Sequence, residues 1–129
     1  LEEAGDLAKA HDSAEAVART LRTLWSAPCV TIAAVHGAAV AGGAGLVTAC
    51  DFALATADTR IGYPEVRRGL VAGLVMTFLR RRVNERDARA LLLRGELIGA
   101  DAAYAMGLLN AVAPAEALDA EVNRCIDVI

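Results

Sequence analysis

The segment His36–Gly45 is the first candidate for a functional site, because its paired glycines precede an alanine-rich stretch. This pattern is typical of a turn that opens a helix. The first N–H groups of a helix have no partner within it and lie at the positive end of its dipole, so they can hold an anion or a developing oxyanion. Close packing of two backbones explains the glycines equally well, and the segment alone does not decide.

Glu65 is the second candidate, because it follows the largely apolar run Ile61–Pro64. A carboxyl group held among apolar residues can transfer protons near neutral pH. A solvated glutamate on a surface turn is the alternative, and without further information it is the favoured one. The chain contains no dinucleotide fingerprint, phosphate-binding loop or G-x-S-x-G elbow, so these two features remain the candidates.

The first half of the chain is predicted to place a strand and a buried helix around the glycine-rich segment. Asp12 is expected to cap an earlier helix that ends at Ser26. Its apolar face repeats at helical spacing: Val17, Leu21, Leu24 and Trp25. Cys29–Val35 is apolar and β-branched, which indicates a strand covered on both faces. Gly42–Cys50 then suits a short buried helix.

The second half is predicted to alternate strands and helices with short connections. In order, we expect strands at 51–57 and 60–63, helices at 73–83, 84–95 and 101–106, an extended segment at 108–112 and a terminal helix at 115–129. Asn84 is expected to cap the helix that stops at Gly95. This order is typical of an α/β layered fold, and 129 residues suffice for one domain.

Composition and charge exclude several classes of protein. Hydrophobic residues make up 56% and aromatic residues 4%, which predicts an aliphatic, alanine-rich core. The net charge of −3 without a basic stripe excludes nucleic-acid binding, and Arg80–Arg82 is interpreted as a solvated helix face. Cys29, Cys50 and Cys125 indicate buried thiols in a reducing compartment, so we expect a cytoplasmic protein without a metal site.

Pro28–Cys50 contains no charged residue, which raises the question of a membrane span. A buried strand, a turn and a buried helix explain this segment better, because it has neither an aromatic belt nor flanking basic loops. We therefore expect no association with a membrane.

Five blocks of sequence, taken in order, resemble the enoyl-CoA hydratase/isomerase (crotonase) family. The longest is Pro28–Asp51, which contains the glycine-rich segment. The others are Phe52–Ala55, Pro64–Leu70, Ala88–Gly95 and Ala105–Val112. Their unbroken order is more specific than any single motif and raises both candidates above their structural alternatives. The resemblance implies a crotonase-like (ClpP/crotonase) layered fold of repeated strand–strand–helix units.

The resemblance also implies roles for individual residues. The backbone N–H of Gly42 matches an oxyanion-hole donor that polarises the carbonyl of an acyl-CoA thioester and stabilises an enolate. Glu65 matches a glutamate that transfers protons. The residues expected to contact the substrate are Ala41, Gly43, Gly45 and Tyr63. Coenzyme A arrives as part of the substrate, so neither a separate cofactor nor a metal is implied.

Gly45 departs from the family pattern, because many hydratases of the family carry a second glutamate there. The leading expectation is hydration of a 2-enoyl-CoA with Glu65 as the proton-transferring group, since some bacterial hydratases of the methylglutaconyl-CoA kind also have glycine at this place. A chain with Glu65 alone is also similar to Δ3,Δ2-enoyl-CoA isomerases, in which one carboxylate moves a proton. A non-catalytic crotonase-like module that binds acyl-CoA or a partner is the remaining alternative.

The resemblance assigns residues 1–129 to the central and C-terminal part of one crotonase-like domain, with N-terminal strands and C-terminal helices partly missing. We expect either a piece of a longer protein or a truncated relative. Ala4–Leu7 is similar to the segment that supplies the family's other oxyanion donor, but no strand precedes it and it is not counted. The family's assembly implies a homotrimer or a dimer of trimers.

Overall fold

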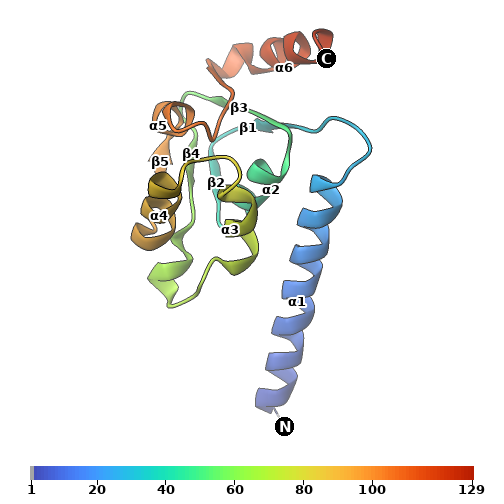
Figure 1. Cartoon of the computed structure of the whole chain (residues 1–129), viewed down its shortest axis with the longest axis vertical. Helices are drawn as coiled ribbons and strands as arrows, with labels where there is room; N and C mark the ends of the chain where they lie inside the picture. The colour runs from blue at the N-terminus through green and yellow to red at the C-terminus, as the bar shows by residue number, and fades with distance from the viewer. Residues whose placement is uncertain (1) are drawn as a thin grey trace.

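The computed structural model describes the backbone of residues 2–129 and the side chains of residues 8–129, so the side chains of Ala4–Leu7 lie outside it (Figure 1). The helices are α1 (Glu2–Trp25), α2 (Gly42–Ala49), α3 (Gly73–Leu79), α4 (Glu85–Arg94), α5 (Ala100–Ala105) and α6 (Leu118–Asp127). The strands are β1 (Ile32–Val35), β2 (Ala38–Val40), β3 (Phe52–Thr56), β4 (Arg60–Gly62), β5 (Ile98–Gly99) and β6 (Ala111–Ala113). Two short 3₁₀ helices are η1 (Pro64–Arg68) and η2 (Ala115–Ala117).

Two small sheets organise the fold. The first has the strand order β1-β3-β6, with both pairs parallel. The second has the order β2-β4-β5, in which β2 and β4 are parallel whereas β4 and β5 are antiparallel. The consecutive strands β1 and β2 enter different sheets, as do β3 and β4, and a helix follows each pair. The chain therefore contains the strand–strand–helix units that the sequence predicted.

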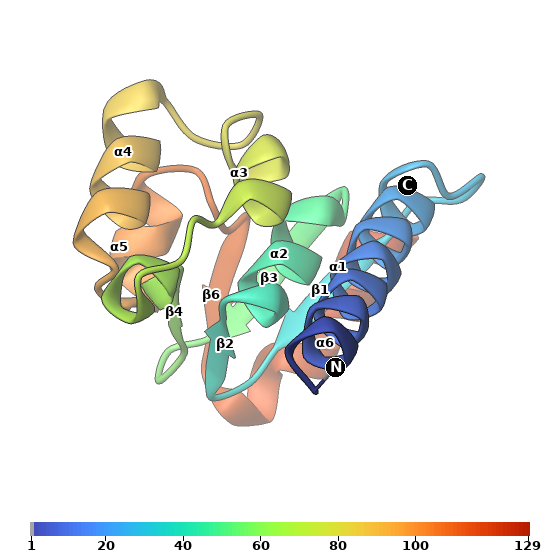
Figure 2. The ribbon, with the colours of Figure 1, turned by 90° about the horizontal axis from the view of Figure 1, so that it is seen from below.

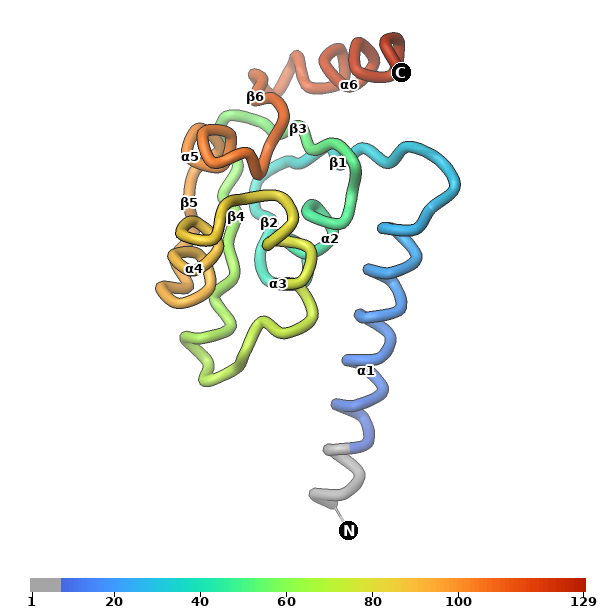
Figure 3. Tube along the Cα trace, viewed as in Figure 1, coloured from blue at the N-terminus to red at the C-terminus, as the bar shows by residue number. Residues whose placement is uncertain are grey.

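Helices lie on both sides of the first sheet. α6 contacts β1, β3 and β6, whereas α2 contacts β1 and β2 and packs beside α1 and α3. Figure 1 shows the strands between α6 and α2, and Figure 2 shows α1, α2 and α3 next to one another. Much of α1 stands clear of the other elements (Figure 3), and its side chains from residue 8 to residue 15 are exposed. α2 is consequently the helix enclosed by strands and neighbouring helices.

The buried residues confirm the predicted aliphatic, alanine-rich core. The only buried aromatic side chains among the described residues are Tyr63 and Phe78. The buried alanines come from most elements: Ala39, Ala44, Ala49, Ala53, Ala55, Ala88, Ala100, Ala103 and Ala113. The strand–turn–helix interpretation of Pro28–Cys50 is also confirmed, since this segment forms β1, β2 and α2. In the described part of the chain, no helix combines the length and the apolar character that crossing a membrane requires.

The predicted start and stop signals of α4 are confirmed. The Asn84 side chain accepts a hydrogen bond of 3.0 Å from the backbone N–H of Asp87, as an N-cap residue does. Gly95 ends the helix in the left-handed conformation, with a φ of 59°.

Other boundaries differ from the prediction. α1 begins at Glu2, so Asp12 lies inside the helix, because residues 2–10 are mostly good helix formers and continue it. β1 begins at Ile32 and is an edge strand of its sheet, which leaves Ala34 exposed and not covered on both faces. Cys29, in the loop before β1, is exposed as well. The strands β2 and β5 were not predicted, because segments of two or three residues are too short to show a period.

Arg82 has a structural role that contradicts its interpretation as part of a solvated face. Its guanidinium donates hydrogen bonds to the backbone carbonyls of Thr48 and Cys50 at the end of α2. It also lies 4.8 Å from the centroid of the Trp25 ring at the end of α1. A cation at a helix C-terminus pairs with unsatisfied carbonyls and with the negative end of the dipole. Arg82 therefore joins the ends of α1 and α2 to the segment that follows α3.

We expect Arg82→Gln to lower the free energy of unfolding by about 1.5–3 kcal/mol, because hydrogen bonds from a charged donor contribute about that much. Arg80→Gln is the matched control, since Arg80 is exposed nearby and is expected to change stability by less than about 0.5 kcal/mol. Denaturant unfolding of both variants measures the difference. Equal effects of the two substitutions would contradict the role of Arg82.

Candidate active site

The ends of two adjacent parallel strands bring Gly42 and Glu65 to the same edge of the second sheet. Val40 of β2 is in register with Gly62 of β4, and the N–H of Ala41 donates to the Gly62 carbonyl at 2.9 Å. Gly42 begins α2 directly after this bond, and Glu65 lies in η1 shortly after Gly62. The carboxyl ends of parallel strands are the usual place for ligand sites in α/β proteins. The two sequence candidates therefore belong to one region.

The start of α2 presents free backbone donors. Among the described residues, none accepts a hydrogen bond from the N–H of Gly42 or Gly43, and no side chain caps the helix. A Cβ atom added at either glycine meets nothing within 4 Å, and both residues are exposed. Open N–H groups at a helix start are suited to hold an oxyanion.

A strained residue creates this arrangement. Ala41, which is half-buried, has a φ of 53° and a ψ of −116°, a conformation that L-residues rarely adopt. Such backbone conformations cost about 1–3 kcal/mol and persist where the surrounding structure holds them. Here the hydrogen bond to Gly62 holds the N–H of Ala41, and the carbonyl of Ala41 accepts the N–H of Gly45 at 2.9 Å. The strained turn at Ala41 therefore lies between β2, whose backbone is paired with β4, and the N–H groups of Gly42 and Gly43, which are unpaired in the described part of the chain.

Glu65 is held by the backbone of η1, while one of its carboxylate oxygens has no partner. The N–H of Leu70 donates to the carbonyl of Glu65 at 3.0 Å, and Gly69 closes the turn with a φ of 70°. The side chain is half-buried, and its Oε2 atom is buried without a hydrogen bond from any described residue. Leaving a buried acceptor unpaired costs about 1–3 kcal/mol, and such groups often have a catalytic purpose. Oε2 is therefore an acceptor without a partner among the described residues.

Tyr63 links the Glu65 segment to the first turn of α2. Its side chain is fully buried, and its hydroxyl donates to the carbonyl of Ala44 at 3.3 Å. Burial raises the pKa of Tyr63 far above its usual range, and the nearby Glu65 carboxylate raises it further, so the hydroxyl stays protonated. Tyr63 was predicted to contact the substrate, whereas its side chain has no exposed surface in the structure. The structure places the Tyr63 side chain in the core, where its hydrogen bond joins the Glu65 segment to α2.

Two glycines let the α4–β5 connection pack against the Glu65 segment. A Cβ atom at Gly62 would lie 2.6 Å from the carbonyl oxygen of Glu96. A Cβ atom at Gly95, which already has a positive φ, would lie 2.8 Å from Cγ1 of Val66 in η1. The need for glycine at position 62 is a long-range packing requirement, and no local motif in the sequence indicated it.

We expect Gly62→Ala to lower the free energy of unfolding by about 1–3 kcal/mol, because its methyl group meets rigid backbone and not a movable side chain. Gly99→Ala, on the neighbouring strand β5, is the control, because a Cβ atom there meets nothing within 4 Å. Thermal unfolding compares the two variants. The packing explanation fails if Gly62→Ala is as stable as Gly99→Ala.

Gly45 lies on α2 but does not face open space. It is buried, and an added Cβ atom would lie 2.5 Å from Cγ1 of Val75 on α3 and 3.5 Å from Cδ2 of Leu21 on α1. The structure therefore encloses Gly45 between two neighbouring helices, whereas Gly42 and Gly43 are exposed. Gly45 was singled out from the sequence but Val75 was not, because their contact joins two helices that are separate in the sequence.

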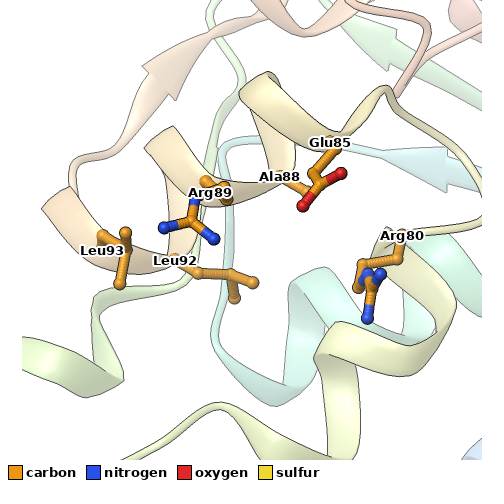
Figure 4. A pocket seen from close by; sticks show the side chains of 6 residues that line it. All are labelled: Arg80, Glu85, Ala88, Arg89, Leu92 and Leu93. Carbon is orange, nitrogen blue, oxygen red and sulfur yellow. The ribbon is translucent and has the colours of Figure 1, made fainter.

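Four cavities elsewhere on the described residues are lined by neither Gly42 nor Glu65. The cavity in Figure 4, of about 250 Å³, lies between the end of α3 and α4. It is lined by Arg80, Glu85, Ala88, Arg89, Leu92 and Leu93. In the described part of the chain, His11, Asp12 and Glu15 bring potential metal ligands within 4.8 Å of one another, but all three are exposed on α1. Neither feature contributes to the region around Gly42 and Glu65.

Comparisons with known proteins identify similar chains. A family model described as enoyl-CoA hydratase/isomerase matches residues 1–129. A Thermus thermophilus protein named "Putative enoyl-CoA hydratase" is 48% identical over 96 residues, which is 74% of this chain and 38% of that protein. The "Crotonyl-CoA hydratase" of Syntrophomonas wolfei is 40% identical over 94 residues, 72% of this chain and 36% of that protein.

Solved structures show the same similarity. A crystal structure of an enoyl-CoA hydratase from Mycobacterium smegmatis matches with a TM-score of 0.88 and 33% identity, covering 94% of this chain and 48% of that one. An enoyl-CoA hydratase/isomerase family protein from Silicibacter pomeroyi matches with a TM-score of 0.87 and 33% identity, covering 92% and 51%. The chain spans about half the length of these structures and less than half the length of the two curated relatives.

Proposed function

The chain belongs to the enoyl-CoA hydratase/isomerase family and has its layered fold, and we propose that it supplies the enolate-forming site of an acyl-CoA enzyme. One observation carries the proposal: the open N–H groups that begin α2 and the buried, unpaired carboxylate oxygen of Glu65 follow adjacent parallel strands. Oxyanion stabilisation and proton transfer are the two functions that enolate chemistry requires.

The N–H of Gly42 donates a hydrogen bond to the carbonyl oxygen of the thioester and stabilises the negative charge that develops there. One such donor typically contributes about 10²–10³ in rate. The N–H of Gly43 and the strained turn at Ala41 lie beside the place proposed for the thioester oxygen. Tyr63 acts on the site indirectly, since its hydrogen bond to the Ala44 carbonyl holds the first turn of α2 beside the Glu65 segment.

Hydration of a 2-enoyl-CoA is the first candidate reaction, because both curated relatives carry the name of a hydratase, one of them as "putative". Water adds its oxygen to C3, a proton joins C2, and the C2–C3 double bond becomes a single bond. Glu65 transfers the proton, and the negative charge passes through the thioester oxygen held by Gly42. General acid–base catalysis of this kind contributes about 10²–10⁴.

Double-bond migration in a 3-enoyl-CoA is the second candidate, and the absence of a side chain at Gly45 favours it. Glu65 takes a proton from C2, the double bond moves from C3–C4 to C2–C3, and the proton returns at C4. The reaction needs no water, so one carboxylate suffices. Coenzyme A is part of the substrate in both reactions. A trimer or a dimer of trimers is proposed on the resemblance alone.

The test is turnover of crotonyl-CoA and of a 3-enoyl-CoA by the full-length protein that carries this sequence, with the 129-residue chain assayed in parallel. We expect conversion of at least one substrate, and product analysis separates the hydrated acyl-CoA from the isomerised one. Binding of acyl-CoA without conversion of either substrate would support the non-catalytic module instead.

A further inference from the structure

The position of Gly45 on α2 determines what a side chain there would face. Gly45 lies three residues after Gly42, so the two are neighbours along the surface of α2. Cα–Cβ bonds of a helix tilt toward its N-terminus. A side chain at position 45 would therefore lean toward the open N–H of Gly42, beside the place proposed for the thioester.

Val75 fills the space that such a side chain needs. Its Cγ1 atom lies 2.5 Å and its Cβ atom 3.2 Å from the ideal Cβ position of residue 45. Contacts as short as 2.5 Å do not occur between real carbon atoms, so residue 45 cannot gain a side chain unless Val75 moves. Movement is restricted, because Val75 is 4% exposed and Leu21 from α1, which is 1% exposed, closes the same space. Well-packed interiors resist added volume.

We infer that Val75 is a specificity-determining residue that keeps the site to a single carboxylate and so lowers the ratio of hydration to double-bond migration. The inference rests on the proposed function. Hydration requires a water molecule to be held beside the double bond in addition to proton transfer by Glu65. The position from which a second polar side chain could hold that water is occupied by the methyl groups of Val75. Migration moves one proton between two carbons and needs no such group.

The structural half of the inference is tested by a thermodynamic cycle on the full-length protein. We expect Gly45→Ala to lower the Tm by about 2–8 °C, because an added methyl group overpacks the contact with Val75. We expect the loss in Gly45→Ala with Val75→Ala to be smaller than the sum of the two single losses, since the second change vacates the space. Additive losses would overturn the steric claim.

The functional half is tested by the exchange Gly45→Glu with Val75→Gly, which supplies a second carboxylate together with the space for it. We expect the ratio of hydration to migration, measured on crotonyl-CoA and a 3-enoyl-CoA, to rise by about 10-fold or more, since a positioned acid–base group contributes about 10²–10⁴. If the variant with Gly45→Glu does not fold, the double variant Gly45→Asp with Val75→Gly takes its place, because the aspartate side chain needs less space.

The outcomes separate the inference from the proposed function. An unchanged ratio in a folded exchange variant, in a protein whose turnover depends on Glu65, overturns the role of Val75 and leaves the proposed function in place. Absence of turnover in the unmodified full-length protein overturns both, even if the stability cycle shows that Val75 and residue 45 compete for space.

Discussion

Gly42→Val is expected to lower kcat/KM of the full-length protein by about 10²–10³, while the free energy of unfolding changes by less than about 0.5 kcal/mol. The reason is that nothing lies within 4 Å of a Cβ atom at this position, so the fold accepts the side chain. The branched side chain then occupies the space beside the Gly42 N–H, where the thioester oxygen is proposed to lie. Function and folding thus make different demands on this glycine.

Gly99→Val is the matched control, because Gly99 caps the start of α5 as Gly42 begins α2, and a Cβ atom there also meets nothing within 4 Å. Gly99 pairs with Arg60 at the start of β4, which is the opposite end of the strand from Glu65. Its substitution is expected to leave turnover within a factor of about two, as for surface changes away from a site. Full activity in Gly42→Val, together with native stability, would show that the start of α2 does not hold the substrate oxygen.

Glu65→Gln is expected to lower kcat by about 10²–10⁴, because the amide can neither accept nor release the proton that general acid–base catalysis requires. Stability is expected to stay equal or to rise, since the substitution replaces a carboxylate whose buried Oε2 has no hydrogen bond from a described residue. Steady-state kinetics and thermal unfolding measure the two effects separately.

Glu116→Gln is the control for this substitution. Glu116 occupies the middle of the 3₁₀ helix η2 shortly after a proline, as Glu65 does near the start of η1, but its side chain is exposed. Turnover by Glu116→Gln is expected to match that of the unmodified protein. A loss of activity in Glu65→Gln that is accompanied by an equal loss of stability would indicate a structural role for Glu65.

The sequence was sufficient to locate the elements that hold the candidate site. The uncharged run from Pro28 to Cys50 and the paired glycines predicted a strand, a turn and a buried helix, and α2 confirms the helix to within one residue. Such local patterns can be read because turn chemistry and helix caps act within a few residues. The Asn84 cap was found for the same reason.

Contacts between distant segments could not be found in this way. The pairing of β2 with β4, which brings Gly42 and Glu65 to one edge, depends on strands too short to show a period. The contact of Val75 with Gly45 joins two helices, and the approach of Glu96 to Gly62 joins a loop to a strand. Tyr63 was predicted to contact the substrate, with a place in the core as an equal alternative, and the structure buries its side chain with the hydroxyl bonded to Ala44. Tertiary packing decided each of these cases.

Hydrogen–deuterium exchange at C2 of a saturated acyl-CoA such as butyryl-CoA tests the central claim most directly, because this compound can be neither hydrated nor isomerised. In D₂O, Glu65 is expected to take the proton from C2, exchange it with solvent and return a deuteron, so mass spectrometry should record a gain in mass with the full-length protein. The same measurement with Glu65→Gln should show no gain above the uncatalysed rate, and Gly42→Val should show a much slower one. Equal exchange by the unmodified protein and Glu65→Gln would contradict proton transfer by Glu65 at the carbon beside the thioester.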